Sequence, residues 1–268
     1  MRRDLLLFFG LAYAITWLGV SPLVAAHLGL IGPVPASLHG LGALGPVCAA
    51  LLVARRGERR DLVVSTFGRC PDSPWLWVAL FSPAALLGVA IAALAFFDPS
   101  ALRWDRLLQA AAQPGWWINL GTASVLYGFG EEPGWRGFAL PRLQRRLPAW
   151  SATLVLSLVW AVWHTPMFFY RFEFDGPATL VGFFVSMLSG AFWLTVLYNS
   201  SGGSVMAVAL WHTLWNVMNL VAAAVSTPLV AVLNGLMMAV GFGVLLSGPG
   251  NLCIGGERTT PGPLGSAT

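Results

Sequence analysis

Long apolar runs separated by short polar segments dominate the hydrophobic pattern of the chain. Crossing the hydrocarbon core of a membrane takes about 20 helical residues. Eight runs approach or reach this length, and the second and fourth are short: 5–26, 38–54, 75–97, 116–132, 150–170, 177–198, 203–224 and 227–247. Each run is expected to be helical, because unpaired backbone groups are costly in lipid. The pattern therefore predicts an all-α, polytopic membrane helix bundle of about eight transmembrane helices.

Composition supports this interpretation. The chain is 57% hydrophobic and only 10% charged, which excludes an ordinary soluble domain. The first run follows Arg2 and Arg3 as in a signal peptide, but it is long and lacks a small-residue cleavage site, so we expect a retained span. Residues 1–247 are predicted to form one transmembrane domain, and the Gly, Pro, Ser and Thr-rich residues 248–268 a disordered tail.

Charge orients the predicted bundle, because positively charged loops stay on the cytoplasmic side. With eight spans and a cytoplasmic N-terminus, three of the fifteen arginines fall in loops on the outer side of the membrane: Arg103, Arg106 and Arg171. The other twelve are inner: Arg2, Arg3, Arg55, Arg56, Arg59, Arg60, Arg69, Arg136, Arg142, Arg145, Arg146 and Arg258. This asymmetry predicts a multi-pass protein of the cell membrane with both termini cytoplasmic. Since no basic domain exists, we expect membrane lipids as partners and no nucleic acid.

The three cysteines give no sign of a metal or disulfide framework. Cys48, Cys70 and Cys253 are dispersed and form no CxxC pair.

Two adjacent carboxylates interrupt the apolar pattern. Nine of the eleven acidic residues fall in predicted loops or tails, but Glu131 and Glu132 belong to a predicted span. Ionisable groups at membrane depth cost about 3 kcal/mol or more and mark pathways or reaction sites. The alternative places both at the cytoplasmic interface, solvated or paired with arginines, for example Glu132 with Arg136 at i, i+4. Pro133 predicts a kink or a helix restart there.

Two other spans carry isolated polar groups. His164 lies near the end of the fifth run, and His212 and Asn216 share one face of the seventh. Each of these side chains alone is explained equally well as a structural residue that forms a hydrogen bond between helices. Together with Glu131 and Glu132 they provide a base, imidazoles and an amide donor, which can activate water and stabilise an oxyanion. Counting along the spans places Glu131 and His164 at different depths, unless residues 137–152 are partly embedded or the span boundaries are shifted. We expect an internal polar cavity that opens to the cytoplasm.

These residues carry a resemblance to a known family. The segment "EEPGWRGFALPRLQ" is similar to the EExxxR motif of the CAAX-protease and bacteriocin-processing (CPBP, or Abi) family of intramembrane endopeptidases. The FxxxH motif is matched in part by "WAVWH", in which Trp160 replaces the phenylalanine and His164 is the histidine. His212 and Asn216 match HxxxN. The resemblance covers about residues 116–220, the expected catalytic core.

The resemblance implies peptide hydrolysis inside a helical bundle. Glu131 would take a proton from water, which His164 helps to hold. His212 and Asn216 would donate hydrogen bonds to the oxyanion, and Glu132 and Arg136 would position the others, with Glu132 as an alternative second acid. A prenylated CAAX tail, a leader peptide and a membrane-protein segment all remain open as substrates, and so does the oligomeric state.

Metal dependence and two other functions stay open. Glu131, His164 and His212 form a His2Glu set that suits Zn²⁺ or another divalent metal, and family members are commonly labelled metalloproteases. The chain has no HExxH motif, and we favour a metal-free reaction with no cofactor. A proton-coupled transporter would also hold these groups, although no inverted repeat is visible. A non-catalytic scaffold or bacteriocin-immunity protein of the same fold would be expected to lack Glu131, His164 or His212.

Overall fold

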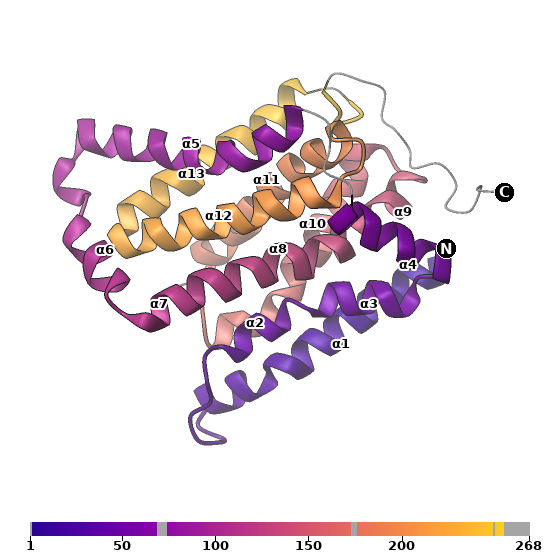
Figure 1. Ribbon diagram of the computed structural model, residues 1–268, viewed down its shortest axis with the longest axis horizontal. Coiled ribbons are helices and arrows are strands. Elements are labelled where there is room, and N and C mark those ends of the chain that lie inside the picture. Colours follow the sequence, from indigo (N-terminus) through magenta and orange to yellow (C-terminus); the bar gives the residue numbers. More distant parts are fainter. Residues whose placement is uncertain (1, 69–73, 173–175, 249, 255–268) are drawn as a thin grey trace.

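The computed structural model describes residues 2–68, 74–172, 176–248 and 250–254, and in these ranges all regular elements are helices (Figure 1). Five helices are long and apolar enough to cross a membrane. They are α1 (Arg2–His27), α5 (Pro74–Phe97), α11 (Pro177–Ser200), α12 (Val205–Val225) and α13 (Thr227–Ser247). They coincide with five of the eight predicted runs, so the prediction of an all-helical, multi-pass membrane protein is confirmed.

The other three runs form shorter or composite elements. Residues 38–54 divide into α2 (Leu38–Gly42) and α3 (Gly45–Val53). The fifth run forms α10 (Ala149–Trp163) followed by a 3₁₀ turn, η5 (Thr165–Phe169). These apolar helices are shorter than a full span. The number of membrane crossings therefore stays a prediction.

The fourth run is part of a longer helical segment that includes two π-helical stretches. It is built from α7 (Pro114–Ile118), η3 (Asn119–Ala123), α8 (Ser124–Glu132), η4 (Pro133–Ala139) and α9 (Leu140–Gln144), which follow each other directly. At the point where we predicted a kink or restart, Glu132 keeps helical angles (φ −63°, ψ −34°) and Pro133 opens η4. The wider π turn accommodates the proline, which lacks an N–H group.

This continuity changes the depth of the carboxylates. Because the segment runs on to Gln144, Glu131 and Glu132 lie far from its end. Phe138, Leu140 and Arg142 are buried beyond them. Most of residues 137–144 are thus packed inside the bundle, and the relative depth of Glu131 and His164 in the membrane stays a prediction.

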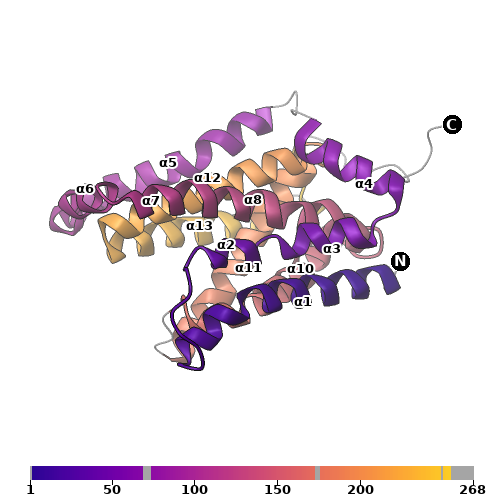
Figure 2. The ribbon, with the colours of Figure 1, turned by 60° about the horizontal axis from the view of Figure 1, so that its bottom comes forward.

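Basic residues gather at one end of the bundle. The N-terminus and α4 (Arg56–Val63) lie at one end, and α6 (Trp104–Ala111) and α7 lie at the other, in both views (Figures 1 and 2). We call the first the arginine-rich end; of the arginines in the described ranges it holds Arg2, Arg3, Arg55, Arg56, Arg59, Arg60, Arg142, Arg145 and Arg146. The opposite end holds Arg103, Arg106 and Arg171.

An ion pair joins two elements at the arginine-rich end. Nη2 of Arg142, on α9, lies 2.6 Å from Oε1 of Glu58, on α4. Arg142 also donates through Nη1 to the Phe138 carbonyl at 2.9 Å, and its guanidinium covers the Phe138 ring. These contacts tie the end of the long helical segment to the surface helix α4.

Close helix packing brings α8 next to α12 and α3. A Cβ atom at Gly128 would overlap the Ala209 backbone and the Thr213 side chain, and one at Gly134 would overlap Pro46. Glycine at these positions permits the approach of backbone to backbone. The glutamates of α8 are therefore close enough to contact a histidine of α12.

The beginning of the predicted disordered tail is folded. Leu252 is 2% exposed, and Asn199 Nδ2 at the end of α11 donates to the Asn251 carbonyl at 3.1 Å. The backbone N–H of Ile254 donates to Ser200 Oγ at 2.9 Å. The expectation of disorder is wrong for residues 250–254, because an apolar side chain among the polar ones finds a buried position. Residues 255–268 and Cys70 lie outside the described residues.

Candidate active site

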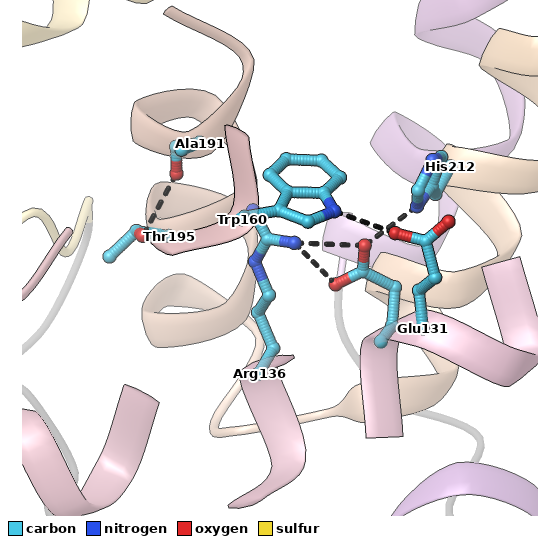
Figure 3. A network of polar contacts seen from close by, with 7 residues as sticks. Glu131, Arg136, Trp160, Ala191, Thr195 and His212 are labelled. Atoms are coloured by element: carbon cyan, nitrogen blue, oxygen red, sulfur yellow. Dashed lines mark hydrogen bonds and ion pairs between the residues drawn. The ribbon is translucent and has the colours of Figure 1, made fainter. Parts of the chain in front are cut away.

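The two glutamates are buried in the bundle. Glu131 is 1% exposed and Glu132 is fully buried. Oε2 of Glu131 accepts a hydrogen bond of 2.7 Å from the indole Nε1 of Trp160, on α10 (Figure 3). Among the described residues no partner is recorded for the other oxygen of Glu131. The alternative of a solvated pair at the interface is therefore wrong.

Glu132 is the centre of a buried ion-pair network. Nη1 of Arg136 donates to both carboxylate oxygens at 3.0 Å. Nδ1 of His212 lies 2.7 Å from Oε1 of the same carboxylate. The i, i+4 pair of Glu132 and Arg136 is thus present as considered above, but it lies away from water, with side chains 0% and 1% exposed.

Arg136 connects this network to α10. Its guanidinium carbon lies 4.4 Å from the centre of the Trp160 ring, so the cation rests on the same indole that binds Glu131. Within the described structure its Nε and Nη2 atoms are buried without a hydrogen-bond partner. Arg136, which we had placed with the inner loops, is therefore part of the site.

The contact with Glu132 fixes the proton on His212. A carboxylate that accepts from a guanidinium on both oxygens has no proton to donate, so the proton of the His212 contact sits on Nδ1. Nε2 then accepts a hydrogen bond when the ring is neutral and donates one only when the ring is cationic. The His212 ring is 7% exposed and stands 5.7 Å from the Trp160 ring, centre to centre.

His164 joins the site through Trp160. It is the C-cap residue that directly follows α10, and its Nδ1 lies 2.8 Å from the Trp160 carbonyl. Because a carbonyl only accepts, Nδ1 carries the proton and Nε2 is left for another partner. The His164 ring lies 5.8 Å from the Trp160 ring. Trp160 therefore contacts both histidines and the nearest carboxylate.

Asn216 lies at the border of a pocket. It is half-buried, one helical turn beyond His212, and no hydrogen bond to the other predicted site residues is recorded within the described structure. The pocket has a volume of about 740 Å³. Its wall is formed by Asn119, Ser124, Tyr127, Phe168, Arg171, Phe172, Thr179, Phe183, Asn216, Asn219, Leu220, Ala223, Thr227 and Val230.

The pocket does not open where we expected. Its wall comes from η3, from the beginnings of α8, α11 and α13, from the end of α12, and from η5 and the turn after it. These elements meet at the end opposite the arginine-rich end (Figure 1). The exposed residues Arg171, Ala223 and Thr227 are part of its wall. This pocket is therefore not the cavity that we expected toward the arginine-rich side, and that cavity stays a prediction.

Trp160 is the site residue that sequence reasoning undervalued. Its replacement of the phenylalanine of the FxxxH motif is conservative in shape, which predicts an effect on the packing around His164 more than on its chemistry. Its N–H group instead binds Glu131, and its ring face carries Arg136. The signal was present in the sequence, since a buried tryptophan near a carboxylate usually finds an acceptor for its N–H group.

The described residues do not form a metal site. No group of three His, Cys, Asp or Glu side chains in these ranges is arranged to hold one ion. Glu131, His164 and His212, the set considered for zinc, each have a separate partner: the Trp160 indole, the Trp160 carbonyl and Glu132. These contacts occupy Nδ1 of both histidines and one oxygen of Glu131, and within the described structure no partner is recorded for the remaining donor atoms. Metal dependence therefore stays a prediction.

Comparison with known proteins identifies relatives of this segment. Residues 113–218 match the model of the family described as type II CAAX prenyl endopeptidase Rce1-like. The chain is also 30% identical over 92 residues to "CAAX prenyl protease 2" of Methanococcus maripaludis. That alignment covers 32% of this chain and 34% of the relative, so about a third of each protein is compared.

The matched segment contains all six residues that the sequence motifs singled out, from Glu131 to Asn216. It agrees with the range of about 116–220 over which the resemblance was found. Residues 113–218 are thus similar to the Rce1-like CAAX prenyl endopeptidases of the CPBP family.

Proposed function

We propose that this protein is an intramembrane endopeptidase that hydrolyses a peptide bond of a membrane-associated or lipidated peptide. The observation that carries the proposal is the buried Glu131, bound on one oxygen by Trp160 and placed beside a charged network of Glu132, Arg136 and His212. Such a group is costly at membrane depth and is hard to explain as packing. We further propose eight membrane crossings, cytoplasmic termini, and a polar cavity that admits the substrate.

Glu131 acts as the general base in this proposal. Its free oxygen removes a proton from a water molecule while the water oxygen attacks the carbonyl carbon of the peptide bond. His164 orients the water through Nε2, the nitrogen that its contact with Trp160 leaves available. When the carbon–nitrogen bond breaks, Glu131 returns the proton to the leaving amine. The products are a carboxylic acid and an amine, and the site is restored.

His212 and Asn216 stabilise the oxyanion of the tetrahedral intermediate. His212 donates from Nε2 in its cationic form, which Glu132 stabilises from the other side of the ring. In that form the two glutamates are balanced by Arg136 and His212, so the buried network has no net charge. Asn216 supplies a second donor from the next turn of α12. The reaction is proposed to proceed without a metal ion, and it then persists in the presence of a chelator.

Two substitutions at His212 distinguish the hydrogen bond of its Nδ1 to Glu132 from the proposed hydrogen bond of its Nε2 to the oxyanion. The amide nitrogen of His212→Asn replaces Nδ1 and keeps the bond to Glu132, whereas the longer His212→Gln reaches the position of Nε2 and gives up that bond. Losing an oxyanion donor costs about a hundredfold or more in rate. We expect His212→Asn to lose about this factor while remaining folded, and His212→Gln to retain more activity per folded molecule.

N-terminal peptide profiling tests the proposal directly. Membranes from cells that express the wild type or His212→Asn at matched levels are compared. New N-termini that appear only with the wild type support an endopeptidase and identify its substrates. If wild-type membranes yield no termini beyond those of the variant although the protein is folded, the hydrolase proposal fails. A scaffold or a proton-coupled transporter would then explain the buried charges better.

Trp160→Phe tests the indole donor, and it installs the residue of the FxxxH motif. A hydrogen bond to a charged group contributes about 1.5–3 kcal/mol, which corresponds to about a tenfold to hundredfold slower reaction if Glu131 depends on it in the transition state. Single-turnover cleavage by purified protein measures the change. Trp17→Phe is the control, since its indole donates to the Trp163 carbonyl and not to Glu131. Equal rates for the two variants would show that Trp160 acts only through packing.

A further inference from the structure

The surface helix α4 turns arginines away from the bundle. Leu62 is buried, and a Cβ atom at Gly137 would overlap its side chain, so this side of α4 packs on the long helical segment. Arg56 and Arg60 are exposed and lie four residues apart, which places them together on another face of the helix. Figure 2 shows α4 outside α3, at the same end as the N-terminus. The outward face of α4 therefore carries positive charge.

A second group of arginines lies close to this helix. Arg145 and Arg146 directly follow α9, and both are exposed. The buried Arg142 shows that the two groups are neighbours, because the positive charges of both Arg145 and Arg55 act on it. We call the exposed arginines of the two groups the basic face: Arg55, Arg56, Arg60, Arg145 and Arg146.

The protein does not balance the charges of the basic face. Within the ranges that the structure describes, none of its five arginines forms an ion pair. Both oxygens of Glu58 already have partners: Oε1 accepts from Arg142 at 2.6 Å, and Oε2 accepts from the backbone N–H of Arg55 at 2.9 Å. Arg59 is occupied too, since its Nε donates to the Ala54 carbonyl at 2.8 Å. Like charges held close together repel, so an external anion would stabilise them.

The basic face lies where apolar and polar parts of the chain meet. The apolar helix α3 ends at Val53, two residues before Arg55, and the apolar helix α10 begins at Ala149, three residues after Arg146. The same segments carry exposed apolar side chains: Leu52, Val63, Phe67 and Trp150. Arginine next to exposed apolar and aromatic side chains is typical of the membrane interface. The basic face is therefore at the depth of the phospholipid head groups.

We propose that the basic face binds anionic phospholipids, with one head-group phosphate shared by Arg55 and Arg145. A guanidinium can bind two phosphate oxygens at once, and an anionic leaflet attracts basic segments beside a membrane helix. The exposed apolar side chains favour a lipid over an acidic peptide, because they can contact its acyl chains. The bound lipid joins α4 to the end of the segment that carries Glu131 and Glu132. This inference does not depend on the proposed endopeptidase function.

A lipid titration of the purified full chain tests the proposal. Native mass spectrometry in an uncharged detergent measures the binding of phosphatidylglycerol, and phosphatidylcholine provides the comparison without net charge. Each arginine near an anionic surface contributes about fivefold to affinity. We expect the wild type to prefer phosphatidylglycerol, and Arg55→Gln/Arg145→Gln to bind it about 25-fold more weakly. Both side chains are exposed, so the variant should unfold at the wild-type temperature.

Two further variants separate the basic face from net charge and from misfolding. Arg103→Gln/Arg106→Gln removes the same charge from exposed positions at the opposite end of the bundle, and it should bind phosphatidylglycerol as the wild type does. Arg55→Lys/Arg145→Lys keeps the charge and should recover most of the affinity. If this lysine variant binds as weakly as the glutamine variant, the lipid is not held by these charges and the proposal is wrong.

Three other results would overturn the proposal. The first is equal weakening in the two glutamine variants, because net charge alone would then attract the lipid. The second is equal affinity of the wild type for the two lipids. The third is displacement of phosphatidylglycerol by inorganic phosphate at the same concentration, since a soluble anion would then satisfy the arginines. Each result is independent of peptide cleavage, so an inactive protein leaves the test intact.

Discussion

Glu131→Gln is expected to slow peptide cleavage by about a thousandfold or more, the largest effect that we predict for any single substitution. General-base catalysis contributes about a hundredfold to ten-thousandfold to a rate. The amide of glutamine keeps the size of the side chain, and its oxygen still accepts the Trp160 hydrogen bond. It cannot take a proton from water. The variant should therefore fold normally and bind substrate, but fail in the chemical step.

Single-turnover kinetics with purified protein and a peptide identified by profiling would measure this loss. Substrate binding, followed by the quenching of tryptophan fluorescence or by co-purification, serves as the control for an intact pocket. If Glu131→Gln cleaves at the wild-type rate, Glu131 is not the base. A parallel loss in Glu132→Gln would then not by itself make Glu132 the base, since that carboxylate holds Arg136 and His212 in place.

Arg136→Met is expected to lower the free energy of unfolding by about 3–5 kcal/mol, because removal of one partner from a buried ion pair leaves the other charge uncompensated. Glu132 would remain fully buried and would keep only the contact with His212. Methionine fills much of the volume of the arginine stem and can still pack on the Trp160 ring. The loss therefore comes from charge and hydrogen bonding and not from a cavity.

Thermal or denaturant unfolding in detergent would measure the stability of this variant. Arg103→Met is a matched control, since it also removes an arginine with a carboxylate partner at 3.0 Å but at an exposed site. We expect no measurable change there, because exposed ion pairs contribute little. Combining Arg136→Met with Glu132→Gln should recover part of the lost stability. If Arg136→Met is as stable as the wild type, the buried charge of Glu132 does not need Arg136 to compensate it, and the prediction is wrong.

Apolar run length was a good guide to the fold. Runs such as 75–97 and 227–247 agree with helices Pro74–Phe97 and Thr227–Ser247 to within one residue, because lipid leaves the backbone no alternative to helix formation. The segment around Pro133 could not be predicted from local rules. Proline normally favours a helix end, but packing against α12 and α3 holds the chain in a wider helical turn.

The chemistry of the site was visible in part. Glu131, Glu132 and the two histidines were found because charged groups are rare in this chain, and the structure brings Glu131, Glu132 and His212 into one network with Arg136. Spacing could not show that His212 contacts Glu132, because that contact joins residues 80 positions apart. Nor could it show which end of the bundle the pocket faces, since this depends on how deep α8 lies.

The π-helical stretch after Glu132 lets one helical segment contact different partners on its two sides. A π turn holds more residues than an α turn, so it shifts the angular phase of everything that follows it. Before the shift the chain presents its glutamates to α10 and α12, and beyond it Arg142 reaches Glu58 of α4. With an uninterrupted α-helix, α9 would be rotated away from this alignment. The extra residues thus allow a single helical segment to hold the proposed reaction site deep in the bundle and to be anchored to α4 at the arginine-rich end at the same time.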